Sequence, residues 1–146
     1  MAYLKNEDIQ ALKALARTLY FSSDTIEHFL QTATAGQIAA TAEMIRYELG
    51  IRNERKIGRL MRKAKFPQIK SFAGYDYSQV AFPEGYSAAD LEGVEFVNAA
   101  QDFVFYGQTG RGKTHLAIAI GMKCVQLGKT VRFFTAAKLV MALERA

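Results

Sequence analysis

The sequence predicts an α/β fold, in which an N-terminal helical region is followed by the first part of a parallel sheet. Apolar residues recur at helical spacing through about the first 65 residues. After residue 100, two short apolar runs, DFVFYG and KTVRFFT, have the composition of buried strands. A helical pattern follows each run, and such alternation implies parallel strands joined by right-handed crossovers.

The chain divides into three predicted regions. Residues 1–65 form a helical N-terminal region with a basic helix, residues 66–86 form a linker, and residues 87–146 form a partial α/β domain. A length of 146 residues suits one ordinary domain or two small ones.

Three helices are predicted in the N-terminal region. The first covers residues 6–20, and the second begins at a serine cap, residues 22–23. The third begins at a capping box formed by Thr34 and Gln37 and runs to about Lys65. Gly50 and Gly58, inside this third helix, weaken its helical pattern.

Positive charge is concentrated in the third helix. Residues 46–70 hold nine basic and two acidic residues, whereas residues 71–100 hold five acidic residues and no lysine or arginine. A local excess of positive charge favours contact with an anion such as the DNA backbone. Such contact does not depend on the base sequence. The alternatives are a solvated helix face, which is the usual role of a charge run, and a surface for a protein partner. The predicted DNA contacts are Arg52, Arg55, Lys56, Arg59, Arg62 and Lys63.

The linker, residues 66–86, has no regular period. It holds both prolines and several aromatic residues that can dock on a core. Its tyrosines, including Tyr75 and Tyr77, could pack on the core or stack on a nucleobase, and packing is the preferred interpretation. Immediately after the linker, Ser87 and Asp90 give the cap signature of a short helix.

The segment from Gly107 to Thr114, GQTGRGKT, matches the phosphate-binding pattern G-x-x-x-x-G-K-[ST], also called Walker A. Its glycines allow the backbone to wrap around a polyphosphate with N–H groups pointing inward, and the following helix adds its N-terminal dipole. Lys113 can reach the β- and γ-phosphates, and Thr114 can offer its hydroxyl to Mg²⁺. A strand pattern before the loop and a helical pattern after it favour a P-loop over a glycine-rich turn. The predicted cofactor-binding residues are Gly107, Gln108, Thr109, Gly110, Arg111, Gly112, Lys113, Thr114 and His115, with Thr114 as the metal ligand.

A family resemblance rests on this loop and its surroundings. FYGQTGRGKTHLAIAIG, followed by GKTVRFFTAAKLVMAL, resembles the IstB-like ATP-binding proteins, AAA+ ATPases that assist insertion-sequence transposases and are related to DnaC-type helicase loaders. The upstream stretch RNERKIGRLMRKAKFPQIKSFAGYDYS is similar to the family's basic helix, FP turn and aromatic segment. The resemblance covers about residues 45–146 well. It implies a P-loop NTPase (AAA+) fold for residues 87–146 and ATP and Mg²⁺ as cofactors. It also implies DNA and a transposase or helicase as partners, and a homo-oligomer when the protein is full length.

Whether the chain is an enzyme is left open by the sequence. A complete AAA+ module also contains an acidic Walker B strand, a sensor residue and an arginine finger, and none of these follows the P-loop before Ala146. We therefore expect the front part of an ATPase, without catalytic residues of its own. The leading hypothesis is an ATP-binding helper of DNA transposition. The alternatives are a DnaC-like replicative helicase loader and a fragment that binds without hydrolysing ATP.

Other features exclude several classes of protein. Cys124 is the single cysteine, which excludes an internal disulfide and a cysteine-based zinc site. The first residues lack the pattern of a signal peptide, and no apolar run reaches the roughly 18 residues needed to cross a bilayer. We therefore expect a cytoplasmic protein with no membrane partner.

Overall fold

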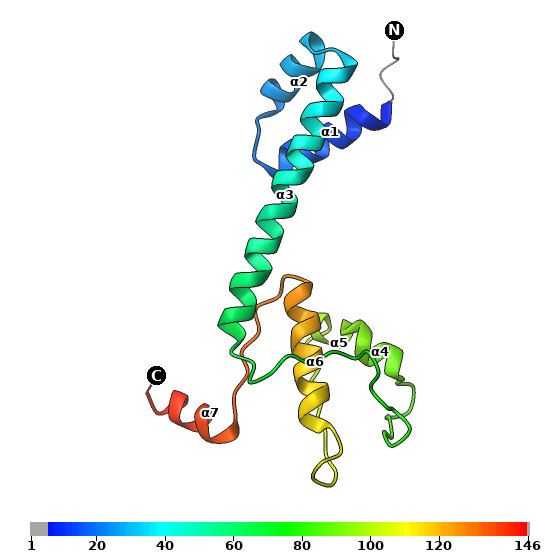
Figure 1. Cartoon of the computed structure of the whole chain (residues 1–146), viewed down its shortest axis with the longest axis vertical. Helices are drawn as coiled ribbons and strands as arrows, with labels where there is room; N and C mark the ends of the chain where they lie inside the picture. Colours follow the sequence, from blue (N-terminus) through cyan, green and yellow to red (C-terminus); the bar gives the residue numbers. More distant parts are fainter. Residues whose placement is uncertain (1–5, 146) are drawn as a thin grey trace. The chain divides into compact units, whose positions relative to one another are not determined.

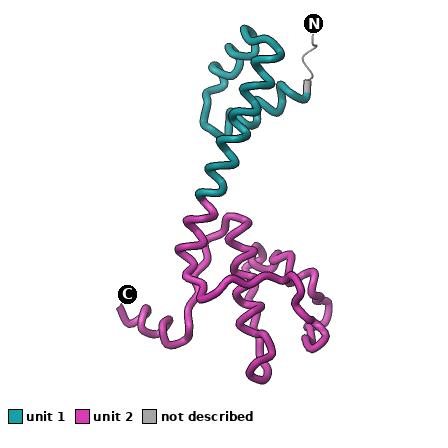
Figure 2. The backbone as a smooth tube through the Cα atoms, in the orientation of Figure 1, with its two compact units in different colours: residues 1–55 teal, residues 56–146 magenta. Residues whose placement is uncertain are grey.

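The computed structural model describes residues 6–145, and seven helices lie within that range. In chain order they are α1 (Asn6–Thr18), α2 (Ser23–Thr32), α3 (Ala35–Ala64), α4 (Ala88–Gly93), α5 (Glu95–Asn98), α6 (Lys113–Gln126) and α7 (Ala136–Leu143) (Figure 1). The chain forms two compact units, residues 1–55 and residues 56–146, and α3 contributes to both (Figure 2).

Local hydrogen bonds fix the starts of two helices in the N-terminal unit. The Ser22 hydroxyl accepts a hydrogen bond from the Thr25 N–H at 3.3 Å and caps α2. Before α3, the Gln37 side chain accepts from the Thr34 N–H at 2.8 Å, and the Thr34 hydroxyl accepts from the Gln37 N–H at 3.3 Å. These bonds satisfy N–H groups that have no partner inside a helix. The predicted serine cap and capping box are confirmed.

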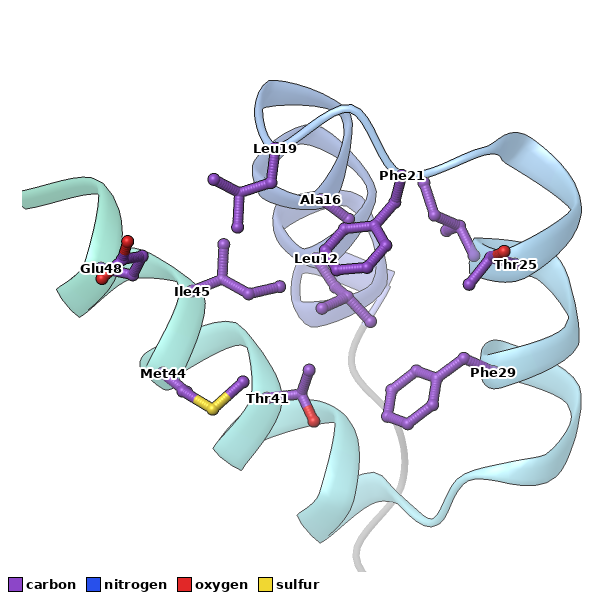
Figure 3. Close-up of a pocket in the computed structure, with 11 residues that line it drawn as sticks. Leu12, Ala16, Leu19, Phe21, Thr25, Phe29, Thr41, Met44, Ile45 and Glu48 are labelled. Carbon is purple, nitrogen blue, oxygen red and sulfur yellow. The ribbon is translucent and has the colours of Figure 1, made fainter. Parts of the chain in front are cut away.

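An apolar core joins α1, α2 and α3 within this unit. Its buried residues are Leu12, Ala16, Ile26, Ile38, Ala42 and Ile45. A cavity of about 380 Å³ lies against this core and is lined mainly by apolar side chains of the three helices (Figure 3). In Figure 3, Leu12, Phe29 and Ile45 come from three different helices and point into the space between them.

The helix α3 is continuous over 30 residues, and Gly50 and Gly58 do not interrupt it. It ends at Ala64, because Lys65 adopts a left-handed conformation with φ of 56°. The next residue, Phe66, precedes a proline, and that position disfavours helical backbone. Neither α3 nor any other helix in the described part of the chain is long and apolar enough to cross a membrane.

A second core lies in the C-terminal unit, where α4 packs against α6. Ser87 and Asp90 form the predicted capping box at the start of α4. The helix α6 ends at Gln126, and Gly128 follows with a φ of 77° and an N–H that donates to the Val125 carbonyl at 2.8 Å. The buried residues of this core are Leu91, Val94, Phe96, Leu116 and Cys124.

The predicted α/β fold class is wrong: residues 6–145 contain helices and loops, and no strand or sheet. The segment 103–106 alternates as a strand would, with Phe103 and Phe105 partly buried, but it forms no backbone ladder with 131–134. A strand requires such a ladder to satisfy its backbone groups.

The aromatic side chains of the two segments pack on different neighbours, while Val131 packs against the same core as Phe103 and Phe105. Phe103 lies against Phe96, with ring centroids 4.8 Å apart. Phe133 lies against Phe66 at 6.3 Å, and its N–H donates to the carbonyl of Ala64 at 2.9 Å. The two apolar runs therefore form loop segments without a partner strand.

The segment 66–86 has no helix and is held by side-chain packing. Phe66 approaches Gly121 of α6, where a Cβ atom would lie 2.8 Å from its ring. The Tyr77 hydroxyl donates to Glu92 of α4 at 2.9 Å. These contacts place the segment against α4 and α6, beside the loop described next.

Candidate functional site

A glycine-rich loop precedes α6 in the C-terminal unit (Figure 1). Gly107, Gly110 and Gly112 have φ values of 138°, 85° and 80°. L-residues with a side chain rarely adopt these values, so glycine at these positions allows the chain to reverse direction tightly. Gly112 is the N-cap residue of α6, and no side chain caps its N–H groups. The loop therefore delivers the chain into a helix N-terminus, which favours an anion.

Lys113 is the first residue of α6, and its side chain folds back over the loop. Its ammonium donates hydrogen bonds to the carbonyl oxygens of Gly107 at 2.8 Å and Gln108 at 2.7 Å. The positive charge is thus held at the start of the loop by two short contacts. A phosphate placed against the loop would meet this charge and the helix N-terminus together.

A cavity of about 380 Å³ opens on one side of the loop. This volume lies in the range of small-ligand sites. Polar or charged lining groups come from the loop and from Gln79, and apolar ones come from residues 80–81 and 104–106. The cavity therefore offers a charged end at the loop and a less polar end beside the linker.

The predicted cofactor-binding residues do not all face this cavity. Those that line it are Gly107, Gln108, Arg111 and Lys113. Thr114 is exposed and lines a different cavity, of about 510 Å³, together with Lys65 and Arg132. The ring of His115 contacts the linker, where its Nε2 lies 2.8 Å from the Ser71 carbonyl oxygen. Thr109, Gly110 and Gly112 belong to the loop without lining the cavity.

Tyr75 and the segment 79–81 line the cavity but were not predicted as site residues. The Tyr75 hydroxyl donates to the carbonyl of Arg111 at 3.3 Å. The sequence indicated only that an aromatic linker precedes the loop. Residues more than 25 positions apart have no fixed spacing in a motif, so the contact of this linker with the loop could not be predicted. Close by, burial and the hydrogen bond to Glu92 raise the pKa of Tyr77 above its ordinary value.

The predicted DNA contacts all lie on α3, and all six side chains are exposed. Arg52 forms an ion pair with Glu48 at 2.7 Å. The ammonium of Lys56 lies near Gly128, at the turn after α6. The described residues contain no group of three or more histidine, cysteine or acidic side chains that could hold a metal ion.

Comparison with known proteins agrees with this loop and its surroundings. The family model described as IstB-like ATP binding protein matches residues 12–146. An ATP-binding protein of insertion sequence IS21 from Pseudomonas aeruginosa is 30% identical over 65% of this chain and 36% of the relative. An ATP-binding protein of insertion sequence IS5376 from Geobacillus stearothermophilus is 31% identical over 70% of this chain and 41% of the relative.

A third relative extends the match toward the N-terminus. It is described as an ATP-binding protein in an insertion sequence of Mycobacterium tuberculosis and is 26% identical over 91% of this chain. The matches span between 36% and 55% of the lengths of these three relatives. No solved structure matches the chain significantly. Because the family model covers nearly the whole sequence, the chain belongs to the family of IstB-like ATP binding proteins.

Proposed function

We propose that this chain binds ATP with Mg²⁺ at the loop Gly107–Thr114, as an ATP-binding helper of insertion-sequence transposition. The observation that carries the proposal is the loop itself. Three glycines at positive φ lead into the N-terminus of α6, and the Lys113 ammonium lies against the loop. Membership of the IstB-like family and the names of its relatives supply the insertion-sequence context.

The phosphates of ATP fit the loop end of the cavity. Backbone N–H groups of the loop and of the first turn of α6 are the donors expected at such a site. Lys113 exchanges its contacts with the carbonyls of Gly107 and Gln108 for contacts with phosphate oxygens. The Thr114 hydroxyl is a hard oxygen ligand of the kind that Mg²⁺ takes together with phosphates and water, and because Thr114 lines a different cavity here, this ligation requires its side chain to turn toward the phosphates. The metal thus requires few ligands from the protein.

The base of ATP fits the less polar end of the cavity, beside the linker. Residues 80–81 and Tyr106 line that end, and the side chain of Tyr106 is 93% exposed. Gln79 adds an amide that can both donate and accept hydrogen bonds. We therefore propose that the adenine lies between the linker and residues 104–106.

DNA and protein partners belong to the same proposal. The exposed basic residues of α3 would contact phosphates of DNA without reading its sequence. A transposase is the proposed protein partner, because the relatives are named for insertion sequences. We also propose that the protein forms a homo-oligomer when it acts and works in the cytoplasm. Residues 1–65 would bind DNA and the transposase, and residues 87–146 would bind the nucleotide.

The decisive test is the affinity for ATP after loss of the Lys113 charge. The variant Lys113→Ala removes hydrogen bonds from a charged donor, each worth about 1.5–3 kcal/mol, so the Kd for ATP with Mg²⁺ should rise about tenfold or more. Isothermal titration calorimetry measures this change. Lys123→Ala, which removes the same charge from the last turn of the same helix, is the matched control and should bind as the wild type does. Equal ATP affinity in wild type and Lys113→Ala would show that the nucleotide site is elsewhere.

A further inference from the structure

Tyr75 lies directly against the end of the glycine-rich loop. Its hydroxyl donates to the carbonyl of Arg111 at 3.3 Å. A Cβ atom built on Gly112, the next residue, would lie 2.5 Å from the Tyr75 hydroxyl oxygen and 3.0 Å from the ring carbon Cε2. The ring therefore fills the space beside Gly112, and the path of the loop and the position of Tyr75 constrain each other.

The ring of Tyr75 is already occupied by protein neighbours. Its centroid lies 4.9 Å from that of Tyr77 and 5.1 Å from that of His115, in tilted arrangements. Such aromatic contacts are favourable in their own right. The hydroxyl end of the same ring lies against Arg111 and Gly112, so the geometry argues for a contact with the loop rather than with a nucleobase.

The neighbours of Tyr75 are themselves anchored to two helices. The Tyr77 hydroxyl donates to Glu92 of α4 at 2.9 Å. Nε2 of His115, in the first turn of α6, lies 2.8 Å from the carbonyl oxygen of Ser71. The segment 71–77 is thus attached to α4 and α6 by side-chain contacts, and these contacts hold Tyr75 in place independently of any ligand.

We propose that Tyr75 is a positioning residue that holds the phosphate-binding loop in the conformation that receives the phosphates. This inference rests on the proposed function of the loop. A loop with three glycines has many accessible backbone conformations, and ordering it on binding costs conformational free energy. Tyr75 reduces that cost by restraining Arg111 and Gly112 before the ligand arrives. The effect acts on the phosphate end of the ligand and is independent of the base.

The experiment compares ATP with inorganic triphosphate, which has the phosphates and no base. Binding of both is measured by displacement of a fluorescent ATP analogue from the whole chain. Tyr75→Phe, which loses one hydrogen bond, should weaken ATP binding about threefold. Tyr75→Ala, which also loses the aromatic contacts, should weaken it about tenfold. For each variant, the affinity for inorganic triphosphate should fall by the same factor as the affinity for ATP.

Matched variants separate this role from a loss of folding. Tyr86 is another tyrosine of the segment 66–86; its hydroxyl donates to Gln101 at 2.9 Å and its ring packs on Phe103. Tyr86→Phe and Tyr86→Ala should leave both affinities unchanged, and circular dichroism with the stoichiometry of binding reports the folded fraction. Reversible unfolding raises the apparent Kd for every ligand by the reciprocal of the folded fraction, so the affinities of each variant are compared after correction for the folded fraction measured by circular dichroism.

Three results would overturn the inference or its basis, and they can be told apart. ATP binding that is insensitive to Lys113→Ala removes the proposed site. ATP binding that is sensitive to Lys113→Ala but unchanged in both Tyr75 variants keeps the site and removes the role of Tyr75. A loss of ATP affinity in the Tyr75 variants with normal affinity for inorganic triphosphate assigns Tyr75 to the base instead of the loop.

Discussion

Two glycines in helices of this chain occupy opposite environments, and only one of them is required by packing. Gly121 is buried in α6, where a Cβ atom would lie 2.8 Å from two ring carbons of Phe66 and 3.4 Å from Val131. Gly50 is exposed in α3, and a Cβ atom there would meet nothing within 4 Å. Gly121 lets an aromatic ring approach the helix backbone closely, whereas Gly50 has no such role.

The same substitution should therefore have opposite effects at these two positions. Gly121→Ala forces the Phe66 ring to move and should lower the free energy of unfolding by about 1–3 kcal/mol, despite the better helix propensity of alanine. Gly50→Ala should raise the free energy of unfolding by about 0.5–1 kcal/mol, because alanine loses less backbone freedom than glycine on folding. Urea unfolding followed by circular dichroism measures both changes.

A background with a smaller side chain tests whether Phe66 is the cause. In Phe66→Leu, the flexible leucine can yield to the new methyl group, so the additional cost of Gly121→Ala should shrink. An unchanged cost in that background would mean that Phe66 does not set the penalty at Gly121.

At the scale of elements, α3 combines a packed part with a charged part. Its first turns contribute Ile38, Ala42 and Ile45 to the core of the N-terminal unit. The following turns present the six exposed basic residues at helical spacing. Among the described residues, the only ion pair is Arg52–Glu48, so most of this positive charge has no acidic partner at ion-pair distance. Charge of this kind is available to an external anion.

Replacing Arg55, Arg59 and Arg62 with alanine should weaken binding to duplex DNA for all sequences alike. Each phosphate contact that is lost should reduce the slope of log affinity against log salt concentration by about 0.9. Fluorescence anisotropy at several salt concentrations measures this slope for two unrelated DNA sequences. The three arginines are chosen instead of Lys56 because the Lys56 ammonium lies at the turn after α6.

A charge-matched control removes three exposed basic residues that lie off this face: Arg17, Lys138 and Arg145. This variant has the same net charge as the triple arginine variant. Equal loss of DNA affinity in both would mean that only net charge matters, and no loss in the arginine variant would make the basic face of α3 a solvated surface.

The elements that were predictable from the sequence are those set by neighbours in the chain. The capping boxes Thr34–Gln37 and Ser87–Asp90 are local hydrogen bonds, and both occur as expected. The glycine loop before α6 is also local, and the sequence identified its span correctly as a turn into a helix. The predicted sheet failed because a strand needs a partner from elsewhere in the chain. A short apolar run indicates that a segment is buried, and it does not supply the partner strand.

The parts of the candidate site that were not predictable come from distant segments. Tyr75 contacts Arg111 and Gly112 across more than 30 residues of sequence, and His115 meets Ser71 across 44 positions. These contacts depend on how the segment 66–86 packs on α4 and α6, which local patterns do not determine. The aromatic composition of the linker indicated that it would pack, without indicating where.

At the scale of the whole molecule, the chain has two units with separate apolar cores. The core of residues 1–55 contains Ile38 and its neighbours, and the core of residues 56–146 contains Leu91 and Leu116. The glycine-rich loop and its cavity belong entirely to the second unit. Leu116 both fills the second core and lines the cavity, so that core directly supports the candidate site. Stability and nucleotide binding should therefore be coupled in the second unit only.

Hydrogen exchange with and without ATP tests this coupling, because amide protection reports the free energy of opening for each part of a chain. A ligand at 100 times its Kd stabilises the unit that binds it by about 2.7 kcal/mol, so ATP should slow exchange in α4 and α6 by up to about a hundredfold. Exchange in α1 and α2 should not change, since none of the buried residues of their core lines the cavity. Lys113→Ala should remove the effect of ATP from α4 and α6. Equal slowing in α1 and α2 would show that the two units unfold together, and the separate cores would then not be separate folding units.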